Sequence, residues 1–140
     1  MKLSITVKIK GCMCGWVGID LQIVEEGGRV EKCTITRKEH NFRAVECIDT
    51  SETVQIKDLA AVNALLQKIK RARVPIFPHC VVGLDGHTVD MTIRSFSHRV
   101  NFHWWVDPPP EQAVLGKIFN DIIALAEAGD AYQRLINTGP

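Results

Sequence analysis

Cysteine and histidine are the residues of this chain best suited to chemistry, because thiolates and imidazoles bind metals and also act as nucleophiles or bases. The chain contains five of each. Cys12 and Cys14 form a close pair, but structural zinc sites usually use C-x₂₋₄-C spacing, and no second close pair at zinc-finger spacing follows. His79 and Cys80 are adjacent, so in a strand their side chains would point apart. We therefore predict no metal site and no cofactor. The other candidates for such a site are Cys33, Cys47, His40, His87, His98 and His103.

A nucleophilic enzyme would need a recognisable local motif around its nucleophile. The sequence contains no G-x-S-x-G, no H-E-x-x-H and no catalytic-cysteine signature. Asp85-Gly86 and Asp90 lie near His87, but Asp-Gly is first of all a turn signal. The stretch 83–86 also lacks the lysine and the strand-to-helix context of a phosphate-binding loop. We predict that the chain is not an enzyme, with a small metal-dependent or Cys/His-dependent enzyme as the alternative.

The length and composition are those of one ordinary globular domain, which we place at residues 1–140. Hydrophobic residues make up 46% of the chain and charged residues 24%, which is an average composition. The formal net charge of +1 argues against a nucleic-acid partner, because phosphate binding usually shows a basic excess. An odd number of scattered cysteines fits reduced thiols better than a disulfide framework.

The first ten residues alternate between apolar and polar side chains and contain no apolar core of a signal peptide. No run approaches the roughly 20 apolar residues that a membrane-spanning helix needs. We expect a cytoplasmic protein with no membrane partner.

Period-two alternation predicts a meander of strands in the first half of the chain. Residues 3–9 and 17–23 each place aliphatic side chains on one face and polar side chains on the other. Residues 25–28 contain two glycines and predict a hairpin turn. Three more strands are expected at residues 29–38, 43–48 and 53–56.

Helical spacing replaces this alternation twice. Leu59, Val62, Leu66 and Ile69 predict a helix with Asp58 at its N-cap; Pro75 and Pro78 follow in an extended link. A second helix is expected to begin at Asp107-Pro108, since proline in the first turn loses no needed N–H. Its apolar stripe runs to Ala128, and Gly129 is expected to stop it. A short terminal turn is expected near residues 131–136.

A hairpin precedes this second helix, with strands at residues 87–94 and 99–106 around a turn at 95–98. The predicted fold is therefore α+β, with an antiparallel sheet of about five to seven strands and two long helices packed on one face. The order is β-meander, helix, β-hairpin, helix. Clean alternation predicts that the other face of the sheet is wet in the isolated chain.

The last strand carries the most informative residues. Every second side chain of this strand is expected in the core, namely Val100, Phe102, Trp104 and Val106. Trp105 belongs to the other set and is therefore expected on the wet face. Trp and Arg are common in interface hot spots because they bury a large area and also hydrogen-bond. The alternatives are that Trp105 is covered by residues 108–110 or by the following helix, or that the patch is a small-molecule groove. We predict a partner-binding patch formed by Trp105, His103, Arg94, Asp90 and Asn101, with Trp16 as a weaker member on another strand.

One stretch also resembles a known group of proteins. The Gly83-Leu84-Asp85-Gly86-His87-Thr88 turn, the Asn101–Trp105 strand, the three prolines at 108–110 and the closing helix look like a pattern in small bacterial proteins, several of which look like immunity partners of polymorphic or secreted toxins. The resemblance covers about the last third of the chain, and it brings no catalytic residues.

The resemblance implies an immunity-type inhibitor whose partner is a cognate protein toxin. The expected mechanism is steric occlusion of the toxin's active site by the wet sheet face and adjoining loops. Without a signal peptide, such a protector suits a toxin that acts in the cytoplasm. A homo-oligomeric scaffold, or a homodimer, in which the wet face pairs with itself is a further alternative.

Overall fold

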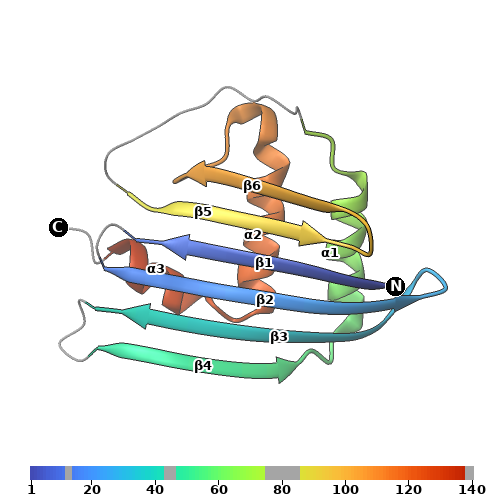
Figure 1. Cartoon of the computed structure of the whole chain (residues 1–140), viewed down its shortest axis with the longest axis horizontal. Coiled ribbons are helices and arrows are strands. Elements are labelled where there is room, and N and C mark those ends of the chain that lie inside the picture. The colour runs from blue at the N-terminus through green and yellow to red at the C-terminus, as the bar shows by residue number, and fades with distance from the viewer. Residues whose placement is uncertain (12–13, 43–46, 75–85, 138–140) are drawn as a thin grey trace.

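The computed structural model describes residues 1–11, 14–42, 47–74 and 86–137. They form one six-stranded antiparallel sheet in the order β4-β3-β2-β1-β5-β6, with all the helices on one face (Figure 1). This confirms the α+β class, the wet second face and the predicted element order. The elements are β1 (Lys2–Lys10), β2 (Gly15–Glu26), β3 (Arg29–Asn41), β4 (Ile48–Gln55), α1 (Leu59–Arg71), β5 (Thr88–Arg94), β6 (Arg99–Trp105), a 3₁₀ turn η1 (Pro110–Gln112), α2 (Ala113–Leu125) and α3 (Gly129–Asn137).

The two central strands form the core as their alternation predicts. On β1 and β2 every second side chain faces the helices and is buried, as Ile5 and its cross-strand neighbour Leu21 illustrate. Burying such a side chain contributes roughly 1.5–3 kcal/mol. The largest fully buried side chains are Ile5, Ile9, Ile19, Leu21, Ile23, Ile35, Leu65, Leu66, Met91, Leu115, Ile118 and Ile122.

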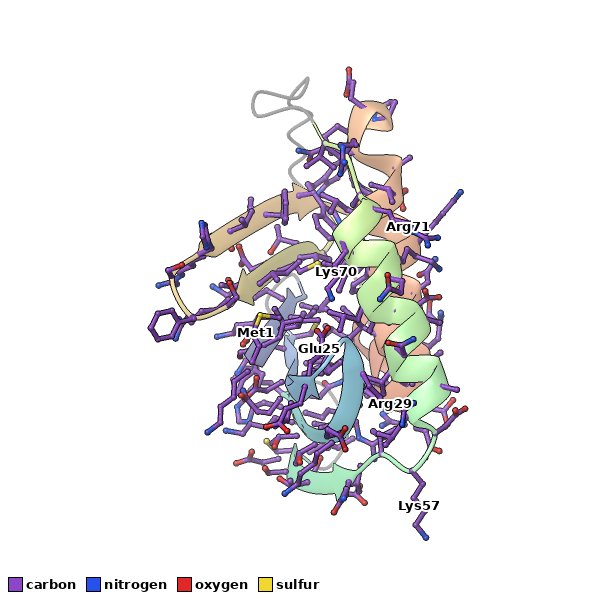
Figure 2. All side chains as sticks on the ribbon, turned by 90° about the vertical axis from the view of Figure 1, so that its right-hand side faces the viewer. Met1, Glu25, Arg29, Lys57, Lys70 and Arg71 are labelled. Atoms are coloured by element: carbon purple, nitrogen blue, oxygen red, sulfur yellow. The ribbon has the colours of Figure 1, made fainter. Side chains whose placement is uncertain are left out.

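Helix α1 begins where the sequence indicates. The Asp58 carboxylate accepts a hydrogen bond from the Ala61 N–H (3.1 Å), which satisfies a free N–H of the first turn. Near the other end of α1, the Lys70 ammonium lies 2.9 Å from the buried Glu25 carboxylate of β2 (Figure 2). This ion pair ties the basic last turn of α1 to the sheet.

The strand boundaries after residue 29 differ from the prediction. Strand β3 continues to Asn41, and β4 runs from Ile48 to Gln55, so the strand expected at 53–56 begins earlier than predicted. The strand expected at 43–48 falls mostly on residues 43–46, which lie outside the described part. The polar composition of β4 hides it, because an edge strand with little burial has no aliphatic alternation to show.

The expected start of the second helix at Asp107-Pro108 is wrong. Pro109 is extended (φ −53°, ψ 151°), the turn η1 begins at Pro110, and α2 begins only at Ala113. A residue that precedes proline is pushed out of the helical region. Three consecutive prolines therefore delay the helix until the last of them is passed.

The expected stop at Gly129 is also wrong. Helix α2 ends at Leu125, and Gly129 is instead the first residue of a third helix, α3. Glu127 takes the left-handed conformation (φ 50°) at the corner. The Arg37 guanidinium donates hydrogen bonds to the Ala126 carbonyl oxygen (3.1 Å) and to that of Glu127, so a cation from the sheet satisfies the helix end.

The core prediction for the last strand holds only in part. Trp104 is buried at 4% exposure, but Val100 is 47% exposed and Phe102 is only partly buried. Val106 lies beyond the strand with a positive φ of 60°. The parity is as predicted, but β6 is an edge strand and the helices cover only its last part. No helix in the described part of the chain is long and apolar enough to cross a membrane.

Candidate protein-binding face

The open face is the side of the sheet on which none of the described helices lies. Cross-strand pairing arranges its side chains in four rows, each of which crosses all six strands from β4 to β6. No large aliphatic side chain occurs in these rows. The first row is Asp49, His40, Trp16, Lys10, Thr88 and Trp105; the second is Ser51, Lys38, Gly18, Lys8, Asp90 and His103; the third is Thr53, Thr36, Asp20, Thr6, Thr92 and Asn101; the fourth is Gln55, Thr34, Gln22, Ser4, Arg94 and Arg99.

The predicted residues on β5 and β6 lie together on this face. His103 Nδ1 lies 2.6 Å from the Asp90 carboxylate, and the Thr92 hydroxyl donates to the Asn101 carbonyl oxygen (3.0 Å). Trp105 is half-buried. A Cβ built on Gly86 would lie 3.2 Å from Trp105 Nε1, so the indole rests on glycine backbone. Two polar pairs and one large aromatic side chain are thus presented side by side.

The outer end of this hairpin carries positive charge. Arg94 and Arg99 face each other across β5 and β6, an arrangement of like charges that is unfavourable in a free sheet. Neither has an ion pair among the described residues. Phe96, in the turn between them, is 98% exposed. Figure 2 shows that this turn projects to the side opposite the helices. An acidic partner surface would relieve the repulsion.

Trp16 forms a second aromatic position on the open face. Its ring stacks on His40 (centroids 6.0 Å apart, interplanar angle 29°), and the Lys8 ammonium lies 5.1 Å from the ring centroid. A Cβ on Gly18 would lie 3.2 Å from Trp16 Cζ3, so the indole lies flat over that glycine. A hollow of about 310 Å³ adjoins it, with Lys8, Trp16, Gly18 and Lys38 in its lining.

The strand order brings the two half-buried tryptophans of the open face into one row. Trp16 pairs with Lys10, Lys10 with Thr88, and Thr88 with Trp105. Neighbouring strands lie about 4.8 Å apart, so about 14 Å separates the two backbones. Sequence reasoning placed Trp16 on the wet face but could not place it beside Trp105, because no local signal says that β1 pairs with β5.

Cations exceed carboxylates on the open face, although the whole chain is nearly neutral. The cations in its four rows are Lys8, Lys10, Lys38, Arg94 and Arg99, and the carboxylates are Asp20, Asp49 and Asp90. Sequence reasoning placed Lys8 and Lys10 on the polar side of their strand, but it did not join them or Lys38 to the predicted patch. Their alternating positions within the strands indicate the polar face, but the sequence does not show which residues of the other strands lie beside them.

The buried titratable groups lie on the helical side. Burial raises the pKa of the Cys33 thiol to about 11, so this cysteine is protonated at neutral pH and is not an activated nucleophile. His87 Nε2 is 2.9 Å from the Tyr132 hydroxyl. Burial lowers the pKa of His87, and the charge of Asp107 partly offsets that effect. The contact between His87 and Tyr132 joins α3 to the residue that precedes β5.

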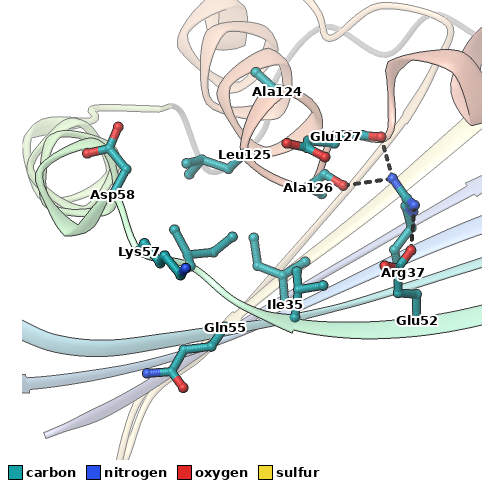
Figure 3. A pocket seen from close by; sticks show the side chains of 12 residues that line it. Ile35, Arg37, Glu52, Gln55, Lys57, Asp58, Ala124, Leu125, Ala126 and Glu127 are labelled. Carbon is teal, nitrogen blue, oxygen red and sulfur yellow. Dashed lines mark hydrogen bonds and ion pairs between the residues drawn. The ribbon is translucent and has the colours of Figure 1, made fainter.

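A groove also lies along the helical side of β4. It has a volume of about 430 Å³ between β4, the start of α1 and the end of α2 (Figure 3). Its lining mixes apolar side chains, such as Ile35 and Val54, with the Arg37–Glu52 ion pair (2.8 Å). A second hollow of about 360 Å³ continues past Ile48 toward α3.

The described residues contain no group of three or more His, Cys, Asp or Glu side chains placed to hold a metal ion. Of the earlier candidates, Cys12, His79 and Cys80 lie outside the described residues, as do Gly83 to Asp85 of the turn that carries part of the resemblance. No protein-family model matches this sequence, and no curated protein matches it.

Proposed function

We propose that this chain is a binding protein of the immunity type, which blocks a cytoplasm-acting toxin by covering part of its surface with the open face. The observation that carries the proposal is the pair of tryptophans, Trp16 and Trp105, in one row of a sheet face that no helix covers. Both side chains are half-buried in the free chain, and large aromatic side chains of this kind can bury their remaining surface when a partner arrives.

The chemistry of the face indicates what the toxin presents. The excess of cations, together with the facing pair Arg94 and Arg99, suits an acidic surface. Complementary charge mainly raises the association rate and selects the partner, whereas the aromatic anchors supply the affinity. An interface of standard size buries about 1,200–2,000 Å² in total, and the six strands of the sheet provide a broad face for it.

The test uses the folded chain as bait in a lysate of its native cells. Wild type is compared with Trp105→Ala, with the charge reversal Arg94→Glu, and with Lys117→Ala, an exposed residue of α2 on the helical side. We expect one partner in near-equal amount that Lys117→Ala retains and that Trp105→Ala and Arg94→Glu lose. Circular dichroism of each variant confirms that it remains folded.

The partner is then expressed alone and together with the bait. The proposal requires that the partner alone arrests growth, that wild type restores growth, and that Trp105→Ala does not. A partner that is harmless by itself, or one that all variants capture equally, would refute it. If Trp105→Ala does not fold, the comparison of wild type with Arg94→Glu decides the test. The Arg94 side chain is exposed, so its replacement leaves the fold intact.

A further inference from the structure

The outer edge of β4 is one of the two edges of the sheet. This strand pairs with β3 over its whole length without a register shift, and nothing in the described part of the chain pairs with its other side. Proteins usually block such an edge with lysine, proline or a bulge. Strand β4 has the sequence IDTSETVQ, which contains no lysine or proline, and it has no bulge; its charged side chains are the carboxylates of Asp49 and Glu52.

The direction of the main-chain groups of β4 follows from one hydrogen bond. The Ile56 N–H donates to the Cys33 carbonyl oxygen (2.9 Å), so this pair is a hydrogen-bonded pair of the antiparallel ladder. Such pairs alternate along a ladder. Residues 48, 50, 52 and 54 therefore point their N–H and C=O groups toward β3. The main-chain groups of Asp49, Ser51 and Thr53 point outward and are free to pair.

We propose that two copies of this chain associate through their β4 strands, antiparallel, around a two-fold axis at Ser51. In this register Ser51 meets Ser51 of the second copy, and Asp49 meets Thr53. These are the residues with outward main-chain groups, so each such pair can exchange two hydrogen bonds. The two six-stranded sheets would become one sheet of twelve strands.

The side chains on the helical side support the same register. Strand β4 has two apolar residues, Ile48 and Val54, and Val54 is 40% exposed. A two-fold axis at Ser51 places Ile48 of each copy opposite Val54 of the other. The groove beside Val54 (about 430 Å³) and the hollow beside Ile48 (about 360 Å³) leave room for these pairs to pack.

The charges of β4 are compatible with this register. With the axis at Ser51, Glu52 lies opposite Thr50, and no like charges face each other. If the axis moves by one residue to Glu52, that carboxylate meets its own copy, which is unfavourable. A shared edge of this kind is isologous and closes at two subunits. It leaves both open faces on the same side of the joined sheet, so the inference stands apart from the proposed function.

The first test is mass in solution, by light scattering, from micromolar to millimolar protein. We expect wild type to reach twice 15.7 kDa at the upper end. The variants Ser51→Lys and Ser51→Glu each place like charges on the axis, and each is expected to stay at the monomer mass. An equal mixture of the two variants is expected to recover the dimer mass, because opposite charges then meet.

A backbone variant provides the matched control. Ser51→Pro removes an outward N–H without breaking the ladder with β3, and edge positions of this kind tolerate proline. Asn101→Pro makes the same change on the opposite edge strand, β6, where the Val106–His87 hydrogen bond (2.8 Å) shows that residue 101 also points outward. Ser51→Pro should abolish the dimer and Asn101→Pro should retain it.

Three results would overturn the proposal. Wild type that stays monomeric at millimolar concentration has no such edge contact. A dimer that persists in both Ser51→Lys and Ser51→Glu uses another surface. A dimer that Asn101→Pro abolishes and Ser51→Pro retains is joined through β6. Amide exchange gives an independent reading, since dilution should expose the N–H groups of Asp49, Ser51 and Thr53.

Discussion

Leu21 and Gln22 are consecutive residues of β2, yet they belong to two different environments. Leu21 is completely buried under the helices, while Gln22 lies on the open face and donates to the Ser4 hydroxyl (3.0 Å). The same contrast repeats along β1 and β5. The covered face is aliphatic because the helices pack against it, whereas no described helix packs against the open face. Its two tryptophans, Trp16 and Trp105, are half-buried among polar neighbours.

The contrast predicts very different costs for substitutions at neighbouring positions. Leu21→Ala should lower the free energy of unfolding by about 2–5 kcal/mol, because it leaves a cavity in a closely packed core. Gln22→Ala should cost less than about 1 kcal/mol, since the hydrogen bond that it removes is exposed. Urea denaturation measures both values. Equal costs would mean that the open face is as important to folding as the covered one.

A smaller loss of stability is expected when the ion pair of a buried carboxylate on the covered side is broken. The buried Glu39 carboxylate accepts two hydrogen bonds from the Arg134 guanidinium, at 2.9 and 2.6 Å. Arg134→Ala leaves that carboxylate without this partner and should cost about 1–3 kcal/mol. Gln133→Ala, next to it on the exposed side of α3, is the control and should be nearly neutral. If the two variants unfold at the same urea concentration, the ion pair contributes nothing.

The histidine on the covered side should make stability depend on pH. Because burial lowers the pKa of His87 in the folded state, the unfolded chain binds the proton more readily. The contribution is therefore fully present above the ordinary histidine pKa of about 6.5 and is lost as the pH falls below it. His87→Gln should flatten this part of the stability curve between neutral and mildly acidic pH. A wild-type curve parallel to that of the variant would contradict the assignment.

The smallest effect is expected on the open face itself. Lys8→Met keeps the aliphatic stem of Lys8 but removes the ammonium above the Trp16 ring. A cation–π contact at an exposed site contributes about 0.5–1 kcal/mol. A double-mutant cycle with Trp16→Leu isolates this contact from other losses. A coupling energy near zero would show that Trp16 is held by Gly18 and His40 alone.

The sequence predicts one of these faces better than the other. Strong alternation in residues 3–9 and 17–23 identified the core, because burial on one face imposes a period of two. It failed for β4, whose helical side is largely exposed and therefore carries no pattern. It also failed at the end of α2, where the contact of Arg37 with Ala126 joins residues 89 positions apart.

The candidate site shows the same limit. Parity alone placed Asp90, His103, Asn101, Arg94 and Trp105 on one face, since they belong to one hairpin with a short turn. Joining Trp16 to that group required the strand order, which depends on long-range packing rather than on any local residue. Their role in binding a partner stays a prediction.

The placement of the three tryptophans has an optical consequence. Trp104 is buried against Phe119, with ring centroids 6.0 Å apart, whereas Trp16 and Trp105 are half-covered on the open face. Indole emission moves to shorter wavelength when water leaves its surroundings. Contact on the open face would shift the light from two indoles toward the blue, and loss of the native state would shift all three toward the red. The emission wavelength of the tryptophans therefore distinguishes a partner-bound molecule from an unfolded one.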